Sequence, residues 1–217
     1  MIYIVNKKTK LETIAKKYPK AIICDVTSKA IDSLVKLSPF YPHGGIPIPF
    51  SEGRKAMCVE GIWQGLKVFE NADIDEAMFL NDKMKDIKRT VRKYGKPLGH
   101  RKGVKGKELL PYIAARIEIF LPSYLWVLEN KVSHIMEKLK AKAKEQDIVL
   151  LDYTTNCNVL NPKTPLSHAY LVKAYAEDNY PKAADLYKAL LAEENGKPTP
   201  SIANKKNKND NNQPSLF

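Results

Sequence analysis

The stretch "CVEGIWQGLKVF" at residues 58–69 constrains the fold most, because it has the periodicity of a helix and yet contains two glycines. A glycine inside a helix costs about 1 kcal/mol relative to alanine. Gly61 and Gly65 are four residues apart, so they share one stripe of the helix, where another backbone or a ligand can approach closely. A second face gathers the residues that we expect in the core: Val59, Ile62, Trp63, Leu66 and Phe69.

Glu60, Gln64 and Lys67 fall on a third stripe of the helix that we predict over residues 57–70. Their spacing places all three on one side, facing either a polar cavity or solvent. A solvent-exposed Glu–Lys face is the simpler interpretation for an isolated helix. The two glycines favour the cavity, because they indicate a helix packed closely on more than one side.

The remaining pattern predicts an α+β fold that is mainly α-helical, with a few short strands. Runs 2–5 and 21–26 read as strands around a helix at 10–18, forming a small βαβ unit or a two-stranded cap. A buried strand is expected at 147–153. Further helices are expected at these ranges: 73–80, 82–94, 108–120 (ended or bent by Pro122), 123–146, 164–177 and 180–195. We therefore predict one globular domain over 1–195, with 1–34 as a small α/β part, and a flexible tail over 196–217.

Composition excludes several classes of protein. No run approaches the about 18 apolar residues of a membrane-spanning helix, and the lysines near the N-terminus are in the wrong order for a signal peptide. The three cysteines are Cys24, Cys58 and Cys157, which are far apart and fit a reducing cytoplasm. No His, Cys or Asp spacing indicates a metal site, and no glycine-rich nucleotide motif follows a strand, so we expect neither a metal nor a cofactor.

The formal net charge is +12, and most of it is concentrated in one segment. Residues 82–107 contain eleven Lys or Arg and two Asp, a net charge of +9. Such a segment suits a polyanion, either a nucleic acid or the diphosphate of a nucleotide. The alternative is a solvated helix and loop without a ligand.

Residues 37–69 resemble the start of the NADAR (NAD- and ADP-ribose-associated) domain family. That family runs Leu-Ser-Asn-Phe-Tyr-Pro, then Val-Glu-His, then Gln-Ala-x-Lys. The matching positions are Leu37, Ser38, Phe40, Tyr41, Pro42, Val59, Glu60, Gln64 and Lys67. Pro39 and Gly61 depart from the pattern, where Asn and His are usual. The segment "DIKRTVRKYGKPLGHRKG" is similar to the family's next helix and basic loop.

The resemblance implies an N-glycosidase that cuts the bond between a ribose and a nitrogen base, on an ADP-ribosyl-type adduct such as ADP-ribosylated guanine in DNA. A carboxylate beside the ring would stabilise the ribosyl cation or take a proton from water. Glu60 is the expected catalytic residue, and Asp152, after the strand at 147–153, is a second candidate that could equally cap a helix. The expected substrate-binding residues are Phe40, Tyr41, Gln64, Lys67, Arg92, Lys96, His100, Arg101 and His168.

A second hypothesis is a non-catalytic module that binds nucleic acid or a nucleotide through residues 82–107. The two hypotheses differ in whether Glu60, Gln64 and Lys67 face a closed pocket or solvent. His168 could bind substrate or could pack or cap a helix.

The chain ends in "QPSLF", which resembles the bacterial sliding-clamp-binding motif Gln-Leu-Ser/Asp-Leu-Phe. Gln213, Leu216 and Phe217 would bind a groove on the clamp, and Pro214 departs from the motif. A plain disordered end is the alternative. A clamp as partner would favour a substrate linked to DNA over a free metabolite.

Overall fold

The computed structural model describes residues 1–195 of the 217. Within them it is a mixed α/β structure in which helix exceeds strand. The predicted tail, with the expected clamp-binding residues Gln213, Leu216 and Phe217, lies outside the described residues.

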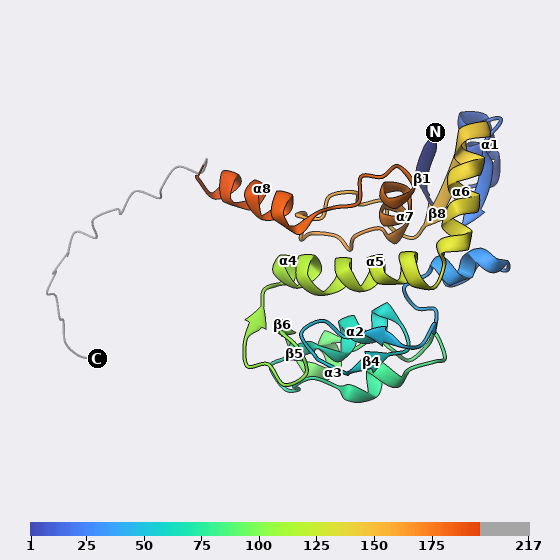
Figure 1. Cartoon of the computed structure of the whole chain (residues 1–217). Helices are drawn as coiled ribbons and strands as arrows, with labels where there is room; N and C mark the ends of the chain where they lie inside the picture. The colour runs from blue at the N-terminus through green and yellow to red at the C-terminus, as the bar shows by residue number, and fades with distance from the viewer. Residues whose placement is uncertain (196–217) are drawn as a thin grey trace, which may run out of the picture.

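A nearly continuous helical rod crosses the middle of the molecule and separates two halves (Figure 1). The rod consists of α4 (Tyr112–Ala115), the π-helical turn η3 (Arg116–Phe120) and α5 (Leu121–Asn130). Pro122 lies in the first turn of α5, directly after the π-helical turn η3, and the rod continues through it. One side of the rod carries a parallel sheet, and the other carries α2 with two small antiparallel sheets.

The parallel sheet has the strand order β1-β8-β2. Its strands are β1 (Ile2–Asn6), β2 (Ile22–Asp25) and β8 (Ile148–Asp152), with α1 (Leu11–Lys17), α6 (Ser133–Glu145) and α7 (His168–Ala176) around them. Every residue of β8 is buried, as expected for a central parallel strand covered on both faces. The sequence correctly predicted all three strands. The interpretation of the first two as a paired cap was wrong, because β8 lies between them.

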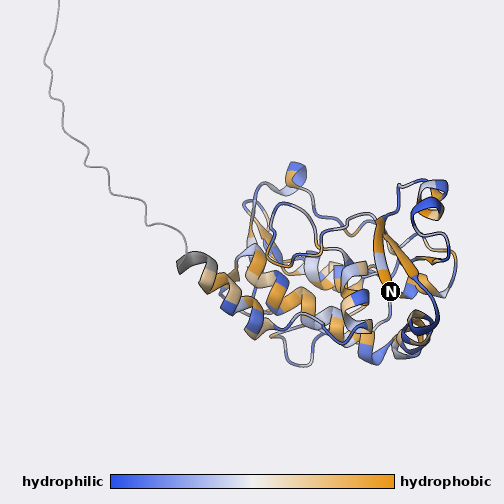
Figure 2. Ribbon diagram, turned by 90° about the horizontal axis from the view of Figure 1, so that it is seen from above, coloured by the Kyte–Doolittle hydropathy of each residue, from blue (hydrophilic) through white to orange (hydrophobic). Residues whose placement is uncertain are grey.

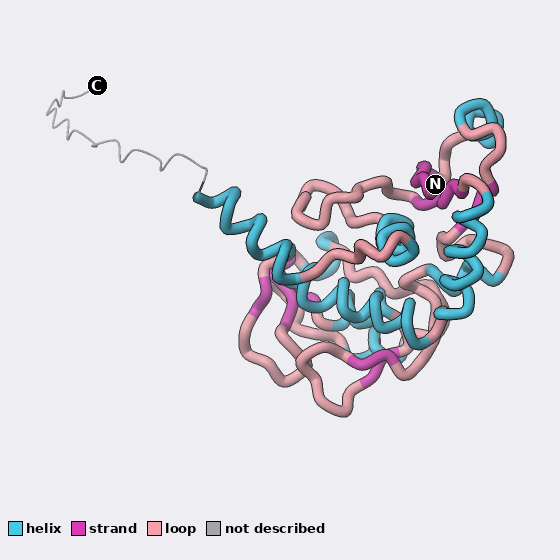
Figure 3. The backbone as a smooth tube through the Cα atoms, turned by 45° about the horizontal axis from the view of Figure 1, so that its top comes forward, coloured by secondary structure: helices cyan, strands magenta, loops and turns pink. Residues whose placement is uncertain are grey.

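The other half is built from short elements joined by long loops (Figure 3). They are β3 (Ile46–Pro47), β4 (Lys55–Ala56), α2 (Val59–Gly65), β5 (Lys67–Phe69), η2 (Glu76–Leu80), α3 (Val91–Tyr94), β6 (Pro97–Arg101) and β7 (Leu109–Leu110). The 3₁₀ helix η1 (Ser33–Leu37) lies beside β2 of the parallel sheet. Strands β3 and β4 pair in one sheet, and the order β5-β6-β7 forms the other.

The two glycines of α2 provide the close approach that their stripe predicted, and the neighbour is another part of the chain. A Cβ atom added to Gly61 would lie 2.6 Å from the carbonyl oxygen of Met78. One added to Gly65 would lie 2.2 Å from the ring of Phe79. Both neighbours belong to η2, so α2 and η2 pack directly through the missing side chains.

Several predicted helices differ from the structure. Residues 73–75 are not helical and Glu76–Leu80 form the short 3₁₀ helix η2, while Leu109–Leu110 of the predicted helix 108–120 form strand β7. Helix α2 ends at Gly65, not at residue 70, because residues 67–69 pair with β6 as a strand. Residues 82–90 are not helical, so only Val91–Tyr94 of the predicted helix forms. The predicted helix at 123–146 breaks after Asn130, since the fully buried Val132 turns the chain into the core before α6.

Hydrophobic side chains gather on the sheet and on the inner faces of the helices, while the loops are mainly hydrophilic (Figure 2). The last described element, α8 (Ala183–Asn195), extends from the body beside the rod (Figure 1). A search of residues 1–195 found no helix with the length and hydrophobicity needed to cross a membrane.

Candidate functional site

A cavity of about 810 Å³ lies between the two halves of the molecule, against the rod. One wall is the edge where the parallel strands β2 and β8 end, the position at which open α/β sheets usually bind ligands. The opposite wall is α2 with the start of β5, and Tyr112, Arg116 and Phe120 line it from the rod. The other lining residues are Thr27, Ser28, Lys29, Ser38, Pro39, Phe40, Glu60, Trp63, Gln64, Lys67, Met84, Lys88, Asp152, Tyr153, Thr154, Thr164, Pro165, Leu166 and His168.

Glu60 lies in the first turn of α2 and is half-buried, with part of its surface facing the cavity. The Gln64 side chain, one turn later, donates a hydrogen bond from Nε2 to Glu60 Oε1 at 2.8 Å. The Glu60 backbone N–H donates to the Pro39 carbonyl at 2.9 Å, which ties α2 to the loop before it. Both contacts fix the direction in which the carboxyl group points.

Burial raises the pKa of Glu60, and this effect outweighs the Gln64 hydrogen bond and the positive charges of Lys67, Lys88 and His168, which lower it. A carboxylate with a raised pKa is a stronger base near neutral pH than an ordinary glutamate. Perturbed carboxyl groups in clefts are frequent at functional sites. Glu60 is therefore equipped to exchange a proton with a molecule in the cavity.

Lys67 lines the cavity as predicted, although it lies on β5 and not on a helix. Burial lowers the pKa of Lys67, and nearby Arg89 lowers it further, while Glu60 raises it. Its amino group has no carboxylate within 4.0 Å among residues 1–195. The cavity wall thus holds an ammonium group that is free to bind an anionic ligand.

Arg89 supports this wall from behind, a role that its place in a basic segment did not reveal. Its guanidinium donates to the backbone carbonyls of Gln64 at 3.2 Å, Lys67 at 2.5 Å and Asp73 at 2.6 Å. Its backbone N–H donates to Gln64 Oε1 at 3.3 Å, which orients the amide that holds Glu60. Arg89 is buried, so this part of the +9 segment stabilises the site and is not a surface for a polyanion.

Aromatic side chains form one wall of the cavity. Trp63, expected in the core, is only half-buried and lines the cavity, as do Phe40, Tyr112 and Phe120. The Trp63 ring stacks on His100 with centroids 3.8 Å apart, and it meets Tyr112 and Phe120 edge to face. Such rings offer a flat surface on which a planar base can stack.

His100, predicted to bind substrate, stacks on Trp63 and does not line the cavity. The residue is 1% exposed, on β6. Burial, with the charge of Lys67, lowers the pKa of His100 to about 3, so the ring is neutral near pH 7. A neutral, buried imidazole cannot hold a phosphate, but it does hold the indole in place.

Asp152 and His168 meet at the end of β8, on the sheet wall of the cavity. Asp152 Oδ2 accepts hydrogen bonds from Ser167 Oγ at 2.7 Å and the Ala169 N–H at 3.3 Å, and it lies 3.0 Å from His168 Nδ1. The Oδ1 atom accepts the Tyr153 N–H at 2.7 Å. This carboxylate is therefore saturated with contacts that join β8 to the start of α7, and a catalytic role for Asp152 is not supported.

Both ring nitrogens of His168 face acceptors, because Nε2 lies 2.8 Å from the Val26 carbonyl oxygen. Burial disfavours the charged imidazolium, but the hydrogen bond and charge of Asp152 outweigh it, so the pKa of His168 is raised. For Asp152, burial opposes ionisation, but His168 and the other donors lower its pKa. The two residues form an ion pair, so together they add no net charge to the sheet wall.

Two other predicted binding residues lie away from the cavity. Tyr41 packs against His43, with ring centroids 4.7 Å apart, and does not line the cavity. Arg101 donates to both carboxylate oxygens of Asp73 at 2.6 and 2.7 Å. An arginine already paired in this way is poorly available to a ligand.

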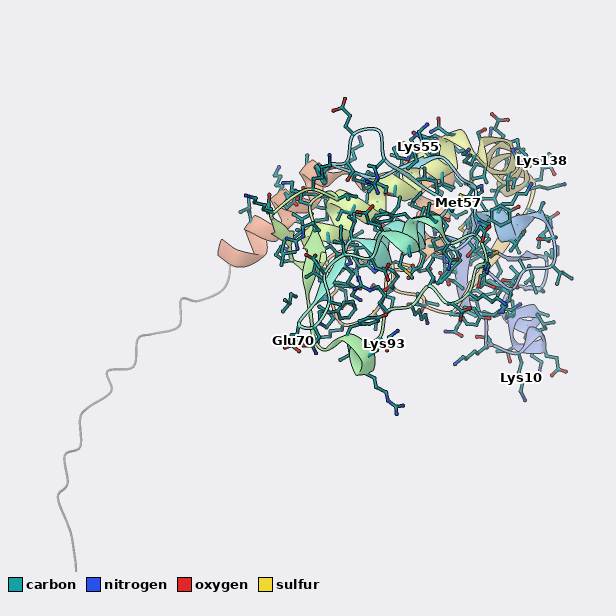
Figure 4. The ribbon with its side chains drawn as sticks, turned by 90° about the horizontal axis from the view of Figure 1, so that it is seen from below. Lys10, Lys55, Met57, Glu70, Lys93 and Lys138 are labelled. Carbon is teal, nitrogen blue, oxygen red and sulfur yellow. The ribbon has the colours of Figure 1, made fainter. Side chains whose placement is uncertain are left out.

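Arg92 and Lys96 are also outside the cavity, on and after the short helix α3. Both are exposed, and the Lys96 backbone N–H donates to Glu70 at 2.8 Å. Figure 4 shows Glu70 and Lys93 of this region at the edge of the molecule. Most of the expected basic loop after α3 is strand β6 in the structure.

The cavity has an excess of positive charge. Its lining contains five basic side chains, Lys29, Lys67, Lys88, Arg116 and His168, and two acidic ones, Glu60 and Asp152. Of the predicted binding residues, Phe40, Gln64, Lys67 and His168 line it together with Glu60. The sequence prediction missed Trp63, Lys88 and Arg116. Lys88 lies in the basic segment, which was a usable signal, but Arg116 sits in an ordinary helical pattern.

The chain belongs to a family of unknown function, DUF6939, whose profile matches residues 6–172. This range contains every residue that lines the cavity, from Thr27 to His168. Comparisons with curated proteins and with solved structures found no match.

Proposed function

We propose that this protein is an N-glycosidase that hydrolyses the bond between a ribose and a nitrogen base in an ADP-ribosyl-type adduct. One observation carries the proposal: the Glu60 carboxyl group, with a raised pKa, is fixed by Gln64 inside a cavity of about 810 Å³. Pockets of about 300–1,000 Å³ are typical for small ligands. The resemblance of residues 37–67 to the NADAR family supports the same reaction, since Glu60, Gln64 and Lys67 are among its matching positions.

In the proposed reaction, a water molecule attacks the anomeric carbon of the ribose as the carbon–nitrogen bond breaks. Glu60 takes a proton from the water, and the electron pair of the broken bond goes to the base nitrogen. The base nitrogen takes up a proton from solvent as the base leaves, the ribose keeps the hydroxyl group, and Glu60 then releases its proton to solvent. A general base of this kind contributes about 100- to 10,000-fold to a rate.

The neighbours of Glu60 suit the charges of this reaction. The Glu60 carboxylate stabilises the positive charge that develops on the ribose. The surrounding protein strengthens this electrostatic interaction, because it excludes water from the site. Gln64 keeps the carboxylate in one orientation, and its own oxygen is held by the Arg89 N–H. Trp63 and Phe40 offer surfaces for the base, and Lys67 and Lys88 offer positive charge to phosphate groups.

The alternative, a nucleic-acid-binding module that uses residues 82–107, has weaker support. Arg89 is buried and bound to carbonyl groups, Arg101 is paired with Asp73, and Lys102 is paired with Glu108 and Glu118. The segment therefore presents less free positive charge than its composition suggests. Glu60, Gln64 and Lys67 also line the cavity, which is the arrangement expected of an enzyme.

The test is product analysis with a panel of substrates. Purified protein is incubated with guanine ADP-ribosylated in DNA, with the corresponding free nucleoside adduct, and with riboflavin-pathway phosphoribosyl intermediates. Chromatography and mass spectrometry should detect a ribosyl product that has gained a hydroxyl group, together with unmodified guanine still in the DNA, the unmodified nucleoside or the released base, according to the substrate. Absence of such a ribosyl product from every substrate, with folded protein at high concentration, would contradict the proposal.

A further inference from the structure

Arg116 is a buried cation that projects into the cavity from the rod. It is 2% exposed and begins the π-helical turn η3. Its Nη1 atom donates to the carbonyl oxygens of Val159 at 2.7 Å and Asn161 at 2.9 Å. Its Nη2 atom donates to the Tyr112 hydroxyl at 2.8 Å and to the Thr164 carbonyl at 3.1 Å.

These four bonds engage both Nη atoms and leave the Nε–H without an acceptor among the side chains and backbone that the structure describes. The surrounding protein does not enclose this nitrogen completely, so it remains accessible. Since Arg116 lines the cavity, the Nε–H is a donor available to a molecule there.

Arg116 also lacks a counter-charge. No carboxylate lies within 4.0 Å of its guanidinium in the described part of the chain. The acid nearest in sequence, Glu118, bonds Tyr187 and Lys102, and Asp152 is paired with His168. A buried charge without a partner of opposite sign is costly, and an anionic ligand in the cavity would supply that partner.

The surroundings of Arg116 fit this interpretation. π-helical turns are rare in proteins, and those that do occur are often found at functional sites. The carbonyl groups that Arg116 binds belong to the loop before α7, which contributes Thr154, Thr164 and Pro165 to the cavity. Tyr112 lies under the guanidinium, with the Arg116 Cζ atom 4.7 Å from the ring centroid. The cation is thus fixed in one position, as a binding group for a planar or tetrahedral anion must be.

We propose that Arg116, with Tyr112 and the loop over it, forms a phosphate-binding subsite that holds the diphosphate of the substrate. The inference rests on the proposed function for the identity of the rest of the substrate. It assigns the two residues different tasks, because Glu60 acts on the ribose–base bond while Arg116 binds the charged group. The basic segment 82–107 contributes only Lys88 from its cations to the cavity.

The test is calorimetric titration of the full chain with three probes: inorganic pyrophosphate, ADP-ribose and adenosine. The variants are Arg116→Gln, which removes the charge, and Arg116→Lys, which keeps the charge but removes the N–H groups of the guanidinium. Arg54→Gln is the matched control, since Arg54 pairs with Glu76 on the surface outside the cavity. Hydrogen bonds to charged groups predict that Arg116→Gln binds pyrophosphate and ADP-ribose about 10- to 100-fold more weakly.

Adenosine, which has no phosphate, should bind Arg116→Gln within about threefold of wild type, and Arg54→Gln should behave like wild type with every probe. An equal loss of affinity for adenosine and pyrophosphate would overturn the inference, because it would mean that Arg116 only holds the loop. Failure of the folded wild-type chain to bind pyrophosphate would overturn it as well, whether or not the variants fold. Hydrolysis is scored separately, so pyrophosphate binding without any turnover would refute the proposed reaction and keep the subsite.

Discussion

Replacing Gly65 by alanine tests how α2, the helix that holds Glu60, is positioned. In an open helix this change would stabilise the protein by about 1 kcal/mol. Here the new methyl group would lie 2.2, 2.7 and 3.0 Å from three carbon atoms of the Phe79 ring, where favourable contacts need about 3.5–4.0 Å. Phe79 is 2% exposed, so the ring cannot move into solvent.

Overpacking of this kind costs about 1–3 kcal/mol. We therefore expect Gly65→Ala to lower the free energy of unfolding by up to about 2 kcal/mol net of the helix gain, and the melting temperature by up to about 8 °C for a domain of this size. Urea denaturation monitored by circular dichroism measures both the midpoint and the slope. An increase in stability would refute the packing of α2 on η2.

A double-mutant cycle with Phe79→Leu isolates the contact. Phe79→Leu alone should destabilise the protein, because it leaves a cavity in the core. In the double variant the smaller side chain gives the new methyl group room, so the combined loss should be smaller than the sum of the single losses by about 1 kcal/mol. If the two losses in free energy of unfolding are strictly additive, the cost of Gly65→Ala does not come from its contact with Phe79.

Three further predictions follow from the cavity. Asp152→Asn should lower the free energy of unfolding by about 3 kcal/mol between about pH 4 and 6.5, measured by denaturation across pH. That difference should narrow as pH rises through the raised pKa of His168 or falls through the lowered pKa of Asp152, and a gap independent of pH would contradict the ion pair. Arg101→Ala should change the Kd for ADP-ribose by less than about twofold, since Arg101 pairs with Asp73 outside the cavity. A tenfold loss of affinity for ADP-ribose would mean that the binding site extends over β6. ADP-ribosylated guanine should quench the fluorescence of Trp63 by stacking on it. This quenching should persist in Trp126→Phe and disappear in Trp63→Phe. Quenching that persists in Trp63→Phe and disappears in Trp126→Phe would exclude stacking on this wall.

Local patterns predicted much of the secondary structure correctly. The strands β1, β2 and β8 are short runs of β-branched and apolar residues, and α1, α7 and α8 have helical spacing with usual end signals. The glycine stripe of α2 correctly predicted a close neighbour. It could not name η2, because the pattern shows that space is required and not which segment fills it.

Contacts that are distant in the sequence were the main source of error. Strand β8 pairs with β1 across about 146 residues, and no local signal places it between β1 and β2. The predicted helix 82–94 fails over most of its length, where the Arg89 side chain binds three backbone carbonyl groups of another segment. The positive charge of residues 82–107 therefore suggested a ligand, although a side chain such as Arg89 stabilises the fold instead.

The candidate site was predictable in part for the same reason. Glu60, Gln64 and Lys67 are close in sequence, so one pattern identified all three, although Lys67 proved to be on a strand. Trp63 was assigned to the core because aromatic residues on an apolar face usually lie there. Arg116 enters the cavity only through the packing of the rod against the loop before α7, which local periodicity does not describe.

The most direct test of the central claim compares turnover and binding in Glu60→Gln. Glutamine keeps the shape of the side chain and can still accept the Gln64 hydrogen bond, so we expect Kd for an ADP-ribosyl–base substrate within about threefold of wild type. It cannot take a proton from water, so kcat should fall on the order of a thousandfold. Glu52→Gln, an exposed change outside the cavity, should retain full activity. Wild-type turnover by Glu60→Gln would contradict the assignment of Glu60 as the catalytic carboxylate.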